Sequence, residues 1–158
     1  GCHPRDQIAL SWLAEELDLS FDLFGAMIEA REKGTEWLGD LCLTEAVRYS
    51  LPIVILGKAY KRGTDLTTGS PAVLLKNLLA EVGRFPRVEQ WDPHVDGESP
   101  LFVDKPAVFF IGSDHDEFYQ MKFVQGSVVV DPWGKMADQE GVQVMRVGRG
   151  SSGAQKEN

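Results

Sequence analysis

The sequence predicts an α/β fold in which a parallel β-sheet carries helices on both faces and is preceded by a short and a long helix. Three strand-like segments, at residues 51–57, 107–113 and 127–133, support the sheet, and the first is a continuous apolar run ended by glycine. Runs that are apolar throughout, rather than at alternate positions, are typical of parallel strands buried on both faces. Segments with helical periodicity lie between them, and this alternation is typical of a Rossmann-like sheet.

The first fifty residues have helical patterns only. Apolar side chains at helical spacing between positions 8 and 17, after Pro4, predict a short helix over about 6–17. Ser20 is the expected N-cap of a second helix that runs to about Tyr49. Because so long a helix exceeds what a small sheet requires, we expect residues 1–50 to form a helical unit that mediates a homodimer. Two helices with a break near Gly34 are the alternative.

From Leu51 onward, strands and helices alternate. Residues 51–57 form the expected central strand, and a loop to Gly69 leads to a helix that has Pro71 in its first turn. We expect residues 51–148 to form a Rossmann-like ligand-binding domain. The further elements predicted in it are strands at 87–93, 107–113 and 127–133, a helix at about 116–124, and an edge strand at 142–148. The Gly/Ser-rich residues 149–158 are expected to be a disordered tail.

Composition narrows the classes of function. The chain has 158 residues and a formal net charge of −8, so it repels nucleic-acid backbones and no nucleic-acid role is expected. No apolar run reaches the length of a membrane span, so no membrane role is expected either. Cys42, within an apolar helical pattern, is interpreted as a small buried residue rather than a disulfide partner. A reducing, cytoplasmic compartment is therefore expected.

The first six residues place a thiol four positions before a carboxylate at the start of a helix. A thiolate is a nucleophile, and a helix N-terminus lowers the pKa of a thiol, so Cys2 and Asp6 are candidate catalytic residues. Asp6 fits equally well as a helix N-cap. A metal site made by Cys2, His3 and Asp6 is not expected, because Pro4 restricts the turn and the sequence has no second Cys/His cluster.

The segment 57–65 follows the first apolar run and contains small residues, Tyr60 and the basic residues Lys58, Lys61 and Arg62. Ligands of open parallel sheets bind at the carboxyl ends of the strands, and this composition suits a phosphorylated nucleotide. The segment is neither G-x-G-x-x-G nor a P-loop, so those phosphate-binding mechanisms are not assigned. An ordinary connection with solvated lysines is the alternative.

Acidic residues end two other predicted strands. Asp92 could hold a ribose hydroxyl, as acidic residues do at the end of the second strand of nucleotide-binding folds. A turn that begins at Asp92-Pro93 is the favoured interpretation, and Asp131-Pro132 is similar. His115, between two aspartates, is interpreted as a solvated residue at a helix start.

Taken in order, these segments resemble the UDP-glucose/GDP-mannose dehydrogenase family. GCHPRD at 1–6 is similar to the catalytic-cysteine loop of the family, and the long second helix is similar to its central helix. ILGKAYKRGTD…GSPA at 55–72 resembles the nucleotide-sugar-binding motif, and VEQWDPHV at 88–95 resembles the strand motif that follows. DEFYQM at 116–121 and VVVDPW at 128–133 match more loosely, and the resemblance covers residues 1–148.

The resemblance implies oxidation of the C6 alcohol of a UDP- or GDP-linked sugar to a carboxylate, with NAD as the oxidant. Cys2 would form a thiohemiacetal whose oxidation gives a thioester, and Asp6 would assist the hydrolysis of that thioester. Tyr60 would lie near the nucleotide or sugar, and Lys61 would contact the substrate. Residues 51–148 would be the nucleotide-sugar-binding domain, and the chain would be the C-terminal part of such an enzyme.

The sequence also departs from the family pattern. It has no glycine fingerprint for NAD, and Thr68 stands where many relatives carry an arginine that reaches NAD. Pro132 and Trp133 stand where the family often has an arginine that helps hold the substrate. We therefore expect the chain alone to bind NAD weakly and to be inactive, since hydride transfer needs an acceptor. A standalone, non-catalytic nucleotide-binding or assembly module is the alternative.

Overall fold

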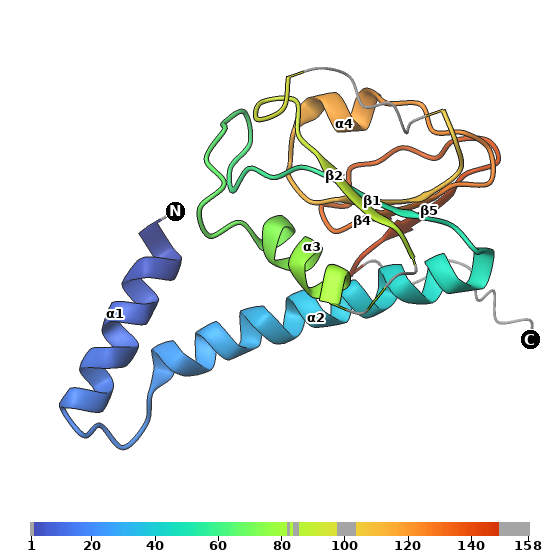
Figure 1. Ribbon diagram of the computed structural model, residues 1–158. Helices are drawn as coiled ribbons and strands as arrows, with labels where there is room; N and C mark the ends of the chain where they lie inside the picture. The colour runs from blue at the N-terminus through green and yellow to red at the C-terminus, as the bar shows by residue number, and fades with distance from the viewer. Residues whose placement is uncertain (1, 82, 84–85, 98–103, 149–158) are drawn as a thin grey trace, which may run out of the picture.

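The structure is a computed structural model that describes residues 2–81, 83, 86–97 and 104–148, with the side chains from Pro4 onward (Figure 1). The predicted tail at 149–158 and the thiol of Cys2 lie outside this description.

A five-stranded parallel sheet forms the centre of the fold, and its strands lie in the order β2-β1-β3-β4-β5. The strands are β1 (Ile53–Leu56), β2 (Val88–Trp91), β3 (Val108–Ile111), β4 (Val128–Asp131) and β5 (Gln143–Arg146). The predicted strand at 142–148 lies at one edge, as expected, and β2 forms the other edge. Because the chain leaves β1 toward β2 and later returns to β3, the topological switch point lies between β1 and β3.

Alternate strand residues pack on opposite faces of the sheet. Ile53, Ile55 and Phe110 belong to a core between the sheet and the helices α2 (Leu23–Tyr49) and α3 (Pro71–Glu81). Leu56 and Phe109 belong to a second core with Phe118 of α4 (Asp116–Gln120), on the opposite face. Figure 1 shows α2 and α3 below the sheet and α4 above it. The predicted α/β fold with helices on both faces is therefore confirmed.

The two N-terminal helices form a hairpin that projects from the sheet (Figure 1). The first, α1 (Cys2–Glu16), begins four residues earlier than expected. The second is one continuous helix of 27 residues, so the alternative with a break near Gly34 is wrong. Its N-cap is Asp22 rather than Ser20, because the Asp22 carboxylate accepts the Gly25 N–H at 2.9 Å.

The C-terminal half of α2 packs under the sheet. Cys42 is fully buried there, and burial raises the pKa of its thiol to about 12. The interpretation of Cys42 as a small buried residue is confirmed. Gly39 packs closely against α3, where a Cβ would lie 3.3 Å from Leu75 Cδ1. Across the described part of the chain, no helix has the length and apolar character needed to cross a membrane.

Candidate nucleotide-sugar site

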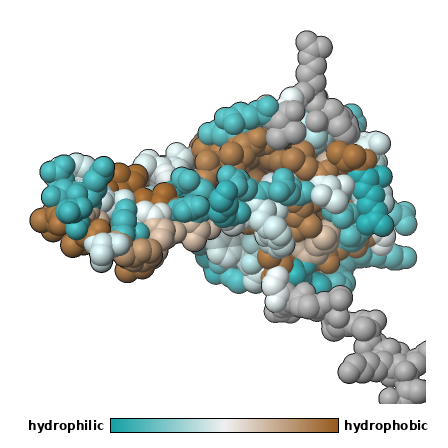
Figure 2. Space-filling view, turned by 90° about the horizontal axis from the view of Figure 1, so that it is seen from below, coloured by the Kyte–Doolittle hydropathy of each residue, from teal (hydrophilic) through white to brown (hydrophobic). Residues whose placement is uncertain are grey.

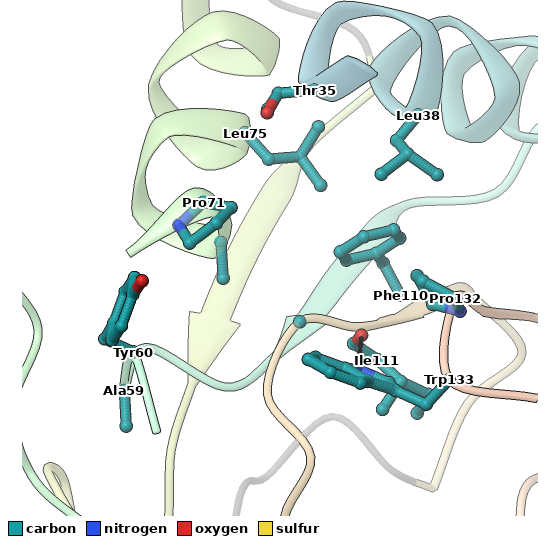
Figure 3. Close-up of a pocket in the computed structure, with 12 residues that line it drawn as sticks. Thr35, Leu38, Ala59, Tyr60, Pro71, Leu75, Phe110, Ile111, Pro132 and Trp133 are labelled. Carbon is teal, nitrogen blue, oxygen red and sulfur yellow. Dashed lines mark hydrogen bonds between the residues drawn. The ribbon is translucent and has the colours of Figure 1, made fainter. Parts of the chain in front are cut away.

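A cavity of about 400 Å³ opens at the carboxyl ends of β1, β3 and β4 (Figure 3). Loop residues after these strands form its floor, and α2 and α3 form its roof. Tyr60 and Trp133 lie on opposite sides of the cavity. Its position beside the β1/β3 switch point is the place where open α/β sheets bind ligands. The lining residues are Thr35, Leu38, Ala59, Tyr60, Pro71, Ala72, Leu75, Phe110, Ile111, Gly112, Pro132 and Trp133.

Asp92 organises the loop that follows β1. Its fully buried carboxylate accepts the N–H groups of Lys58 at 2.7 Å and Ala59 at 2.9 Å, and that of His94 at 2.8 Å. Burial raises the pKa of Asp92, but these backbone donors lower it by more, and the net pKa lies below its usual value. The turn interpretation of Asp92 is supported by the His94 bond, but the same carboxylate also fixes the loop of a neighbouring strand.

His115 is the other end of this buried network, so its interpretation as a solvated residue was wrong. The side chain is fully buried, with Nε2 3.1 Å from Asp92 Oδ2. Its Nδ1 accepts the Gly63 N–H at 3.0 Å. A sequence-based interpretation missed this role because the partner groups lie 23 and 52 residues away along the chain.

The backbone of Ala59 is held from both sides. Its N–H donates to Asp92 and its carbonyl oxygen accepts the Ser113 hydroxyl at 2.6 Å. Gly57, just before it, has a φ of +117°, and a Cβ there would lie 2.5 Å from the Ser113 backbone nitrogen. The close approach of β1 and β3 therefore requires glycine at this position. These contacts place Tyr60 at the cavity wall.

The three basic residues of the loop differ in their surroundings. Lys58 Nζ pairs with Asp96 at 2.6 Å, and Arg62 pairs with Asp116 at the start of α4. Lys61 is exposed, and none of the ion pairs among the described residues involves it. Of the three, Lys61 is therefore the cation that a ligand could engage without breaking an ion pair.

Trp133 is a cavity residue that the sequence-based prediction did not assign to a site. Its Nε1–H donates to the Ile111 carbonyl at 3.0 Å, which fixes the indole while 46% of the residue is exposed. The buried Asp131 carboxylate caps the same turn by accepting the Trp133 N–H at 2.9 Å. Its position directly after a buried strand is the signal that could have identified it.

A polar cluster lies beyond this turn. Lys135 Nζ is 2.7 Å from the Asp114 carboxylate, which also accepts the Tyr119 hydroxyl at 2.7 Å. Burial raises the pKa of Asp114, but the Lys135 and Tyr119 bonds lower it more. Burial and the same carboxylate raise the pKa of Tyr119, so the phenol stays neutral and donates. This cluster is a tightly bonded structural feature rather than a free acid or base.

The candidate catalytic residues lie in the first turns of α1, close to the loop that connects β1 to α3. Pro4 in the first turn of α1 packs beside Gly69, where a Cβ would lie 3.1 Å from Pro4 Cγ. Cys2 starts this helix, but its side chain is outside the described residues. Asp6 is exposed and accepts the Arg5 guanidinium at 3.3 Å. The structure thus brings the turn that contains Cys2 next to the loop of Tyr60 and Lys61.

A search for metal-ligand geometry in the described residues finds His94, His115 and Glu117, whose donor atoms lie within 4.8 Å of one another. His115 has no free lone pair in this arrangement, since Nδ1 accepts the Gly63 N–H and Nε2 faces Asp92. His94 Nε2 lies 3.2 Å from Glu117 Oε1. The group is therefore a hydrogen-bonded network rather than a preformed metal site.

The described residues do not fit a dinucleotide cofactor. A Rossmann dinucleotide site needs a glycine-rich turn that leads from the first strand directly into a helix N-terminus. Here the loop 57–70 separates β1 from α3, and the first turn of α3 is capped by Ser70, whose Oγ accepts the Ala72 N–H at 3.2 Å. Thr68 is exposed and uncharged.

The sheet order and the cavity at its switch point define the chain as a Rossmann-like α/β unit. No model of a known protein family matches it. The chain is 26% identical over 147 residues to UDP-glucose 6-dehydrogenase TuaD of Bacillus subtilis, a match that covers 91% of this chain and 30% of that protein.

Three solved structures are similar in fold. They are GDP-mannose dehydrogenase from Pseudomonas aeruginosa (21% identity, TM-score 0.73, 91% of this chain and 38% of that one), UDP-glucose dehydrogenase from Pyrobaculum islandicum (22%, 0.71, 92% and 36%) and UDP-D-ManNAc dehydrogenase from Pyrococcus horikoshii (23%, 0.70, 86% and 36%). All four proteins are nucleotide-sugar dehydrogenases, so the predicted resemblance is confirmed. The chain spans about a third of their lengths.

Proposed function

We propose that this chain is the nucleotide-sugar-binding part of a nucleotide-sugar 6-dehydrogenase, and that its ligand is a UDP- or GDP-linked sugar. The observation that carries the proposal is the cavity at the β1/β3 switch point, with Tyr60 in its wall and the exposed Lys61 next in sequence. The resemblance to nucleotide-sugar dehydrogenases supports the choice of ligand.

The lining residues and Lys61 suggest that different parts of the ligand would contact different residues. The cavity lining is mainly apolar and contains three aromatic side chains, which suits a ring system and excludes water from it. The diphosphate needs a cation, and Lys61 supplies one without the loss of an existing ion pair. Trp133 stands where the family often has an arginine, so the ligand contact there would be apolar rather than ionic.

The test is a thermal-shift and calorimetry panel of UDP, GDP and their sugars. A ligand that binds the folded state raises its melting temperature, whereas nucleosides without phosphate should have a smaller effect. Absence of a shift and of binding heat with every UDP and GDP compound would overturn the proposal.

Lys61→Ala tests the assignment of the diphosphate contact. We expect about a tenfold weaker affinity for the nucleotide sugar, because a charge-assisted hydrogen bond contributes about 1.5–3 kcal/mol. Lys122→Ala is the matched control, since it removes another exposed lysine, which follows α4. Equal affinities of the two variants would contradict a role for Lys61.

For catalysis, we propose that Cys2 and Asp6 act as nucleophile and hydrolytic assistant in the whole enzyme, where NAD supplies the oxidising chemistry. The chain alone should give no steady NADH formation with UDP-glucose and NAD, because its described residues do not provide a dinucleotide site. Sustained NADH formation would contradict this and would favour a complete active site in the chain.

We also propose a homodimer through α2. The hairpin of α1 and α2 exposes large apolar side chains, among them Trp12, Met27 and Trp37 at 60%, 46% and 55% exposure. Figure 2 shows hydrophobic surface along this projecting part. A second copy of the same helix offers a matching surface, as isologous interfaces do.

Trp37→Glu tests the dimer. We expect the dissociation constant to rise by at least about tenfold, since an aromatic anchor is replaced by a charge. Val95→Glu, on the turn after β2 and 40% exposed, is the control. Sedimentation that shows a monomer of the unmodified chain at high concentration would overturn the dimer.

A further inference from the structure

The buried pair of Asp92 and His115 joins three chain segments that are distant in sequence. Asp92 follows β2, His115 precedes α4, and both contact the loop after β1. We propose that His115 is a positioning residue for ligand binding: it fixes the loop that carries Tyr60 and Lys61 by accepting the Gly63 N–H. The ligand in this inference rests on the function proposed above.

The geometry determines how the imidazole is bonded. Backbone N–H groups can only donate, so the 3.0 Å contact with Gly63 makes Nδ1 the acceptor. The other nitrogen then carries the hydrogen and donates to Asp92 Oδ2 at 3.1 Å. His115 is thus a neutral ring with a defined tautomer. It accepts a hydrogen bond from the Gly63 N–H of the loop and is oriented by the hydrogen bond that it donates to Asp92.

The two contacts bracket the candidate ligand residues. Asp92 holds the backbone at Lys58 and Ala59, on the amino side of Tyr60 and Lys61. His115 holds it at Gly63, on the carboxyl side. Within the loop, the Tyr60 N–H donates to the Leu66 carbonyl at 2.7 Å, which closes a turn that contains the Gly63 anchor. Loss of the Gly63 anchor would therefore free Lys61 more than any strand residue.

The surroundings of His115 favour hydrogen bonding over other roles. The His94 ring lies 4.5 Å away, and Phe118 makes an edge contact at 5.3 Å. Charged groups around it are Asp92, Glu117 on α4 and the Arg62–Asp116 ion pair. His115 is fully buried and has no free lone pair, so it cannot contact a ligand directly. It acts by holding the loop in place.

Two substitutions separate positioning from simple packing. His115→Phe keeps a ring of similar size against Phe118 but removes the acceptor for Gly63. His115→Asn keeps an oxygen that can take the place of Nδ1 but loses most of the ring volume. We expect His115→Phe to have the higher free energy of unfolding of the two variants, and His115→Asn to have the higher affinity for the nucleotide sugar. For UDP- or GDP-sugar, we expect about tenfold weaker affinity for Phe and less than about threefold for Asn.

The opposite order would overturn the inference. If affinity follows stability, with Phe binding as tightly as the unmodified chain and Asn more weakly, His115 is a packing residue only. His94→Phe is the control, since it keeps the ring contact and leaves both His115 bonds in place. It should not change the affinity.

Amide hydrogen exchange keeps this test independent of the proposed function. In His115→Phe, exchange at Gly63 should accelerate at least tenfold, while Gly112, whose N–H donates to the Leu56 carbonyl at 2.7 Å, should be unchanged. If the unmodified chain binds no UDP or GDP compound, the proposed ligand is wrong, and the Gly63 result alone decides whether His115 positions the loop. Unchanged exchange at Gly63 would overturn that positioning.

Discussion

The hairpin arm, residues 2–34, and the sheet region, the described residues from 35 to 148, treat apolar side chains in opposite ways. In the arm, nine large apolar side chains among the described residues are exposed; they are Ile8, Leu10, Trp12, Leu13, Leu17, Leu19, Phe21, Leu23 and Met27. In the sheet region, the strand residues of β1, β3 and β4 are buried throughout. The sheet region therefore has a buried core of its own, although Trp37 near its boundary with the arm is also exposed, whereas most large apolar side chains of the arm are exposed.

The contrast supports the proposal that the arm makes contacts beyond this chain. Short helices are marginal in water and normally gain stability from a packed apolar face. Here α1 packs on α2, but much of the apolar surface of both stays exposed (Figure 2). A second copy of the chain is the partner that we propose for it.

A matched pair of phenylalanines tests this contrast most strongly. Phe109→Ala, at a fully buried position in β3, should lower the free energy of unfolding by about 3–5 kcal/mol, because it leaves a cavity between the sheet and α4. Phe21→Ala, at 67% exposure in the arm, should change it by less than about 0.5 kcal/mol in the monomer. Denaturant unfolding at low protein concentration measures both.

Similar losses for the two variants would show that the arm is folded onto a core that this structure does not contain. A large effect of Phe21→Ala only at high protein concentration would instead place Phe21 in an interface between copies.

The pH dependence of stability provides a second comparison, between two carboxylates that accept backbone N–H groups. Asp92 is buried in the sheet region, and its net pKa is lowered in the folded state despite burial, by the backbone donors of Lys58, Ala59 and His94. The folded pKa therefore lies below the unfolded value of about 3.9. The stabilisation is fully present above about pH 5 and is lost as pH falls through the folded pKa.

Asp92→Asn should remove this part of the acid sensitivity and lower stability at neutral pH, because an amide NH₂ would face backbone donors. Asp22 is the counterpart in the arm; its pKa is lowered first by the Gly25 N–H and then by Ser11. Asp22→Asn should change stability little, since asparagine caps helices about as well. Urea unfolding between pH 2.5 and 7 distinguishes these results, and equal pH profiles for Asp92→Asn and the unmodified chain would contradict the role of Asp92.

The parts of the fold that were predictable are those set by local pattern. The apolar stretches identified β1, β3 and β4, because strands buried on both faces carry mostly apolar side chains. The cavity beside the β1 loop was likewise predictable, since ligands of such sheets bind where strands end. The roles of Tyr60 and Lys61 themselves, and those of Cys2 and Asp6, stay predictions.

The parts that were not predictable depend on contacts between distant segments. His115 lies between two aspartates, a solvated pattern in sequence, yet the tertiary fold buries it against Asp92. The position of Trp133 after a buried strand indicates the edge of the sheet where ligands bind, but it does not indicate that α2 lines the same cavity. The N-cap moved from Ser20 to Asp22 because both are good capping residues and the choice depends on the turn between the helices.

Two glycines of α2, one on each side of the boundary between the arm and the sheet region, give the comparison with the smallest expected effect. A Cβ on Gly34 would meet no atom within 4 Å, so Gly34→Ala should stabilise the chain by about 1 kcal/mol through helix propensity alone. A Cβ on Gly39 would lie 3.3 Å from Leu75 Cδ1 and 3.7 Å from Leu79 Cδ2, both buried. Gly39→Ala should therefore gain less than Gly34→Ala, since the same propensity is offset by crowding between α2 and α3. Equal gains in thermal unfolding would show that α3 can move away from α2, and that the close contact at Gly39 is not what joins the long helix to the sheet region.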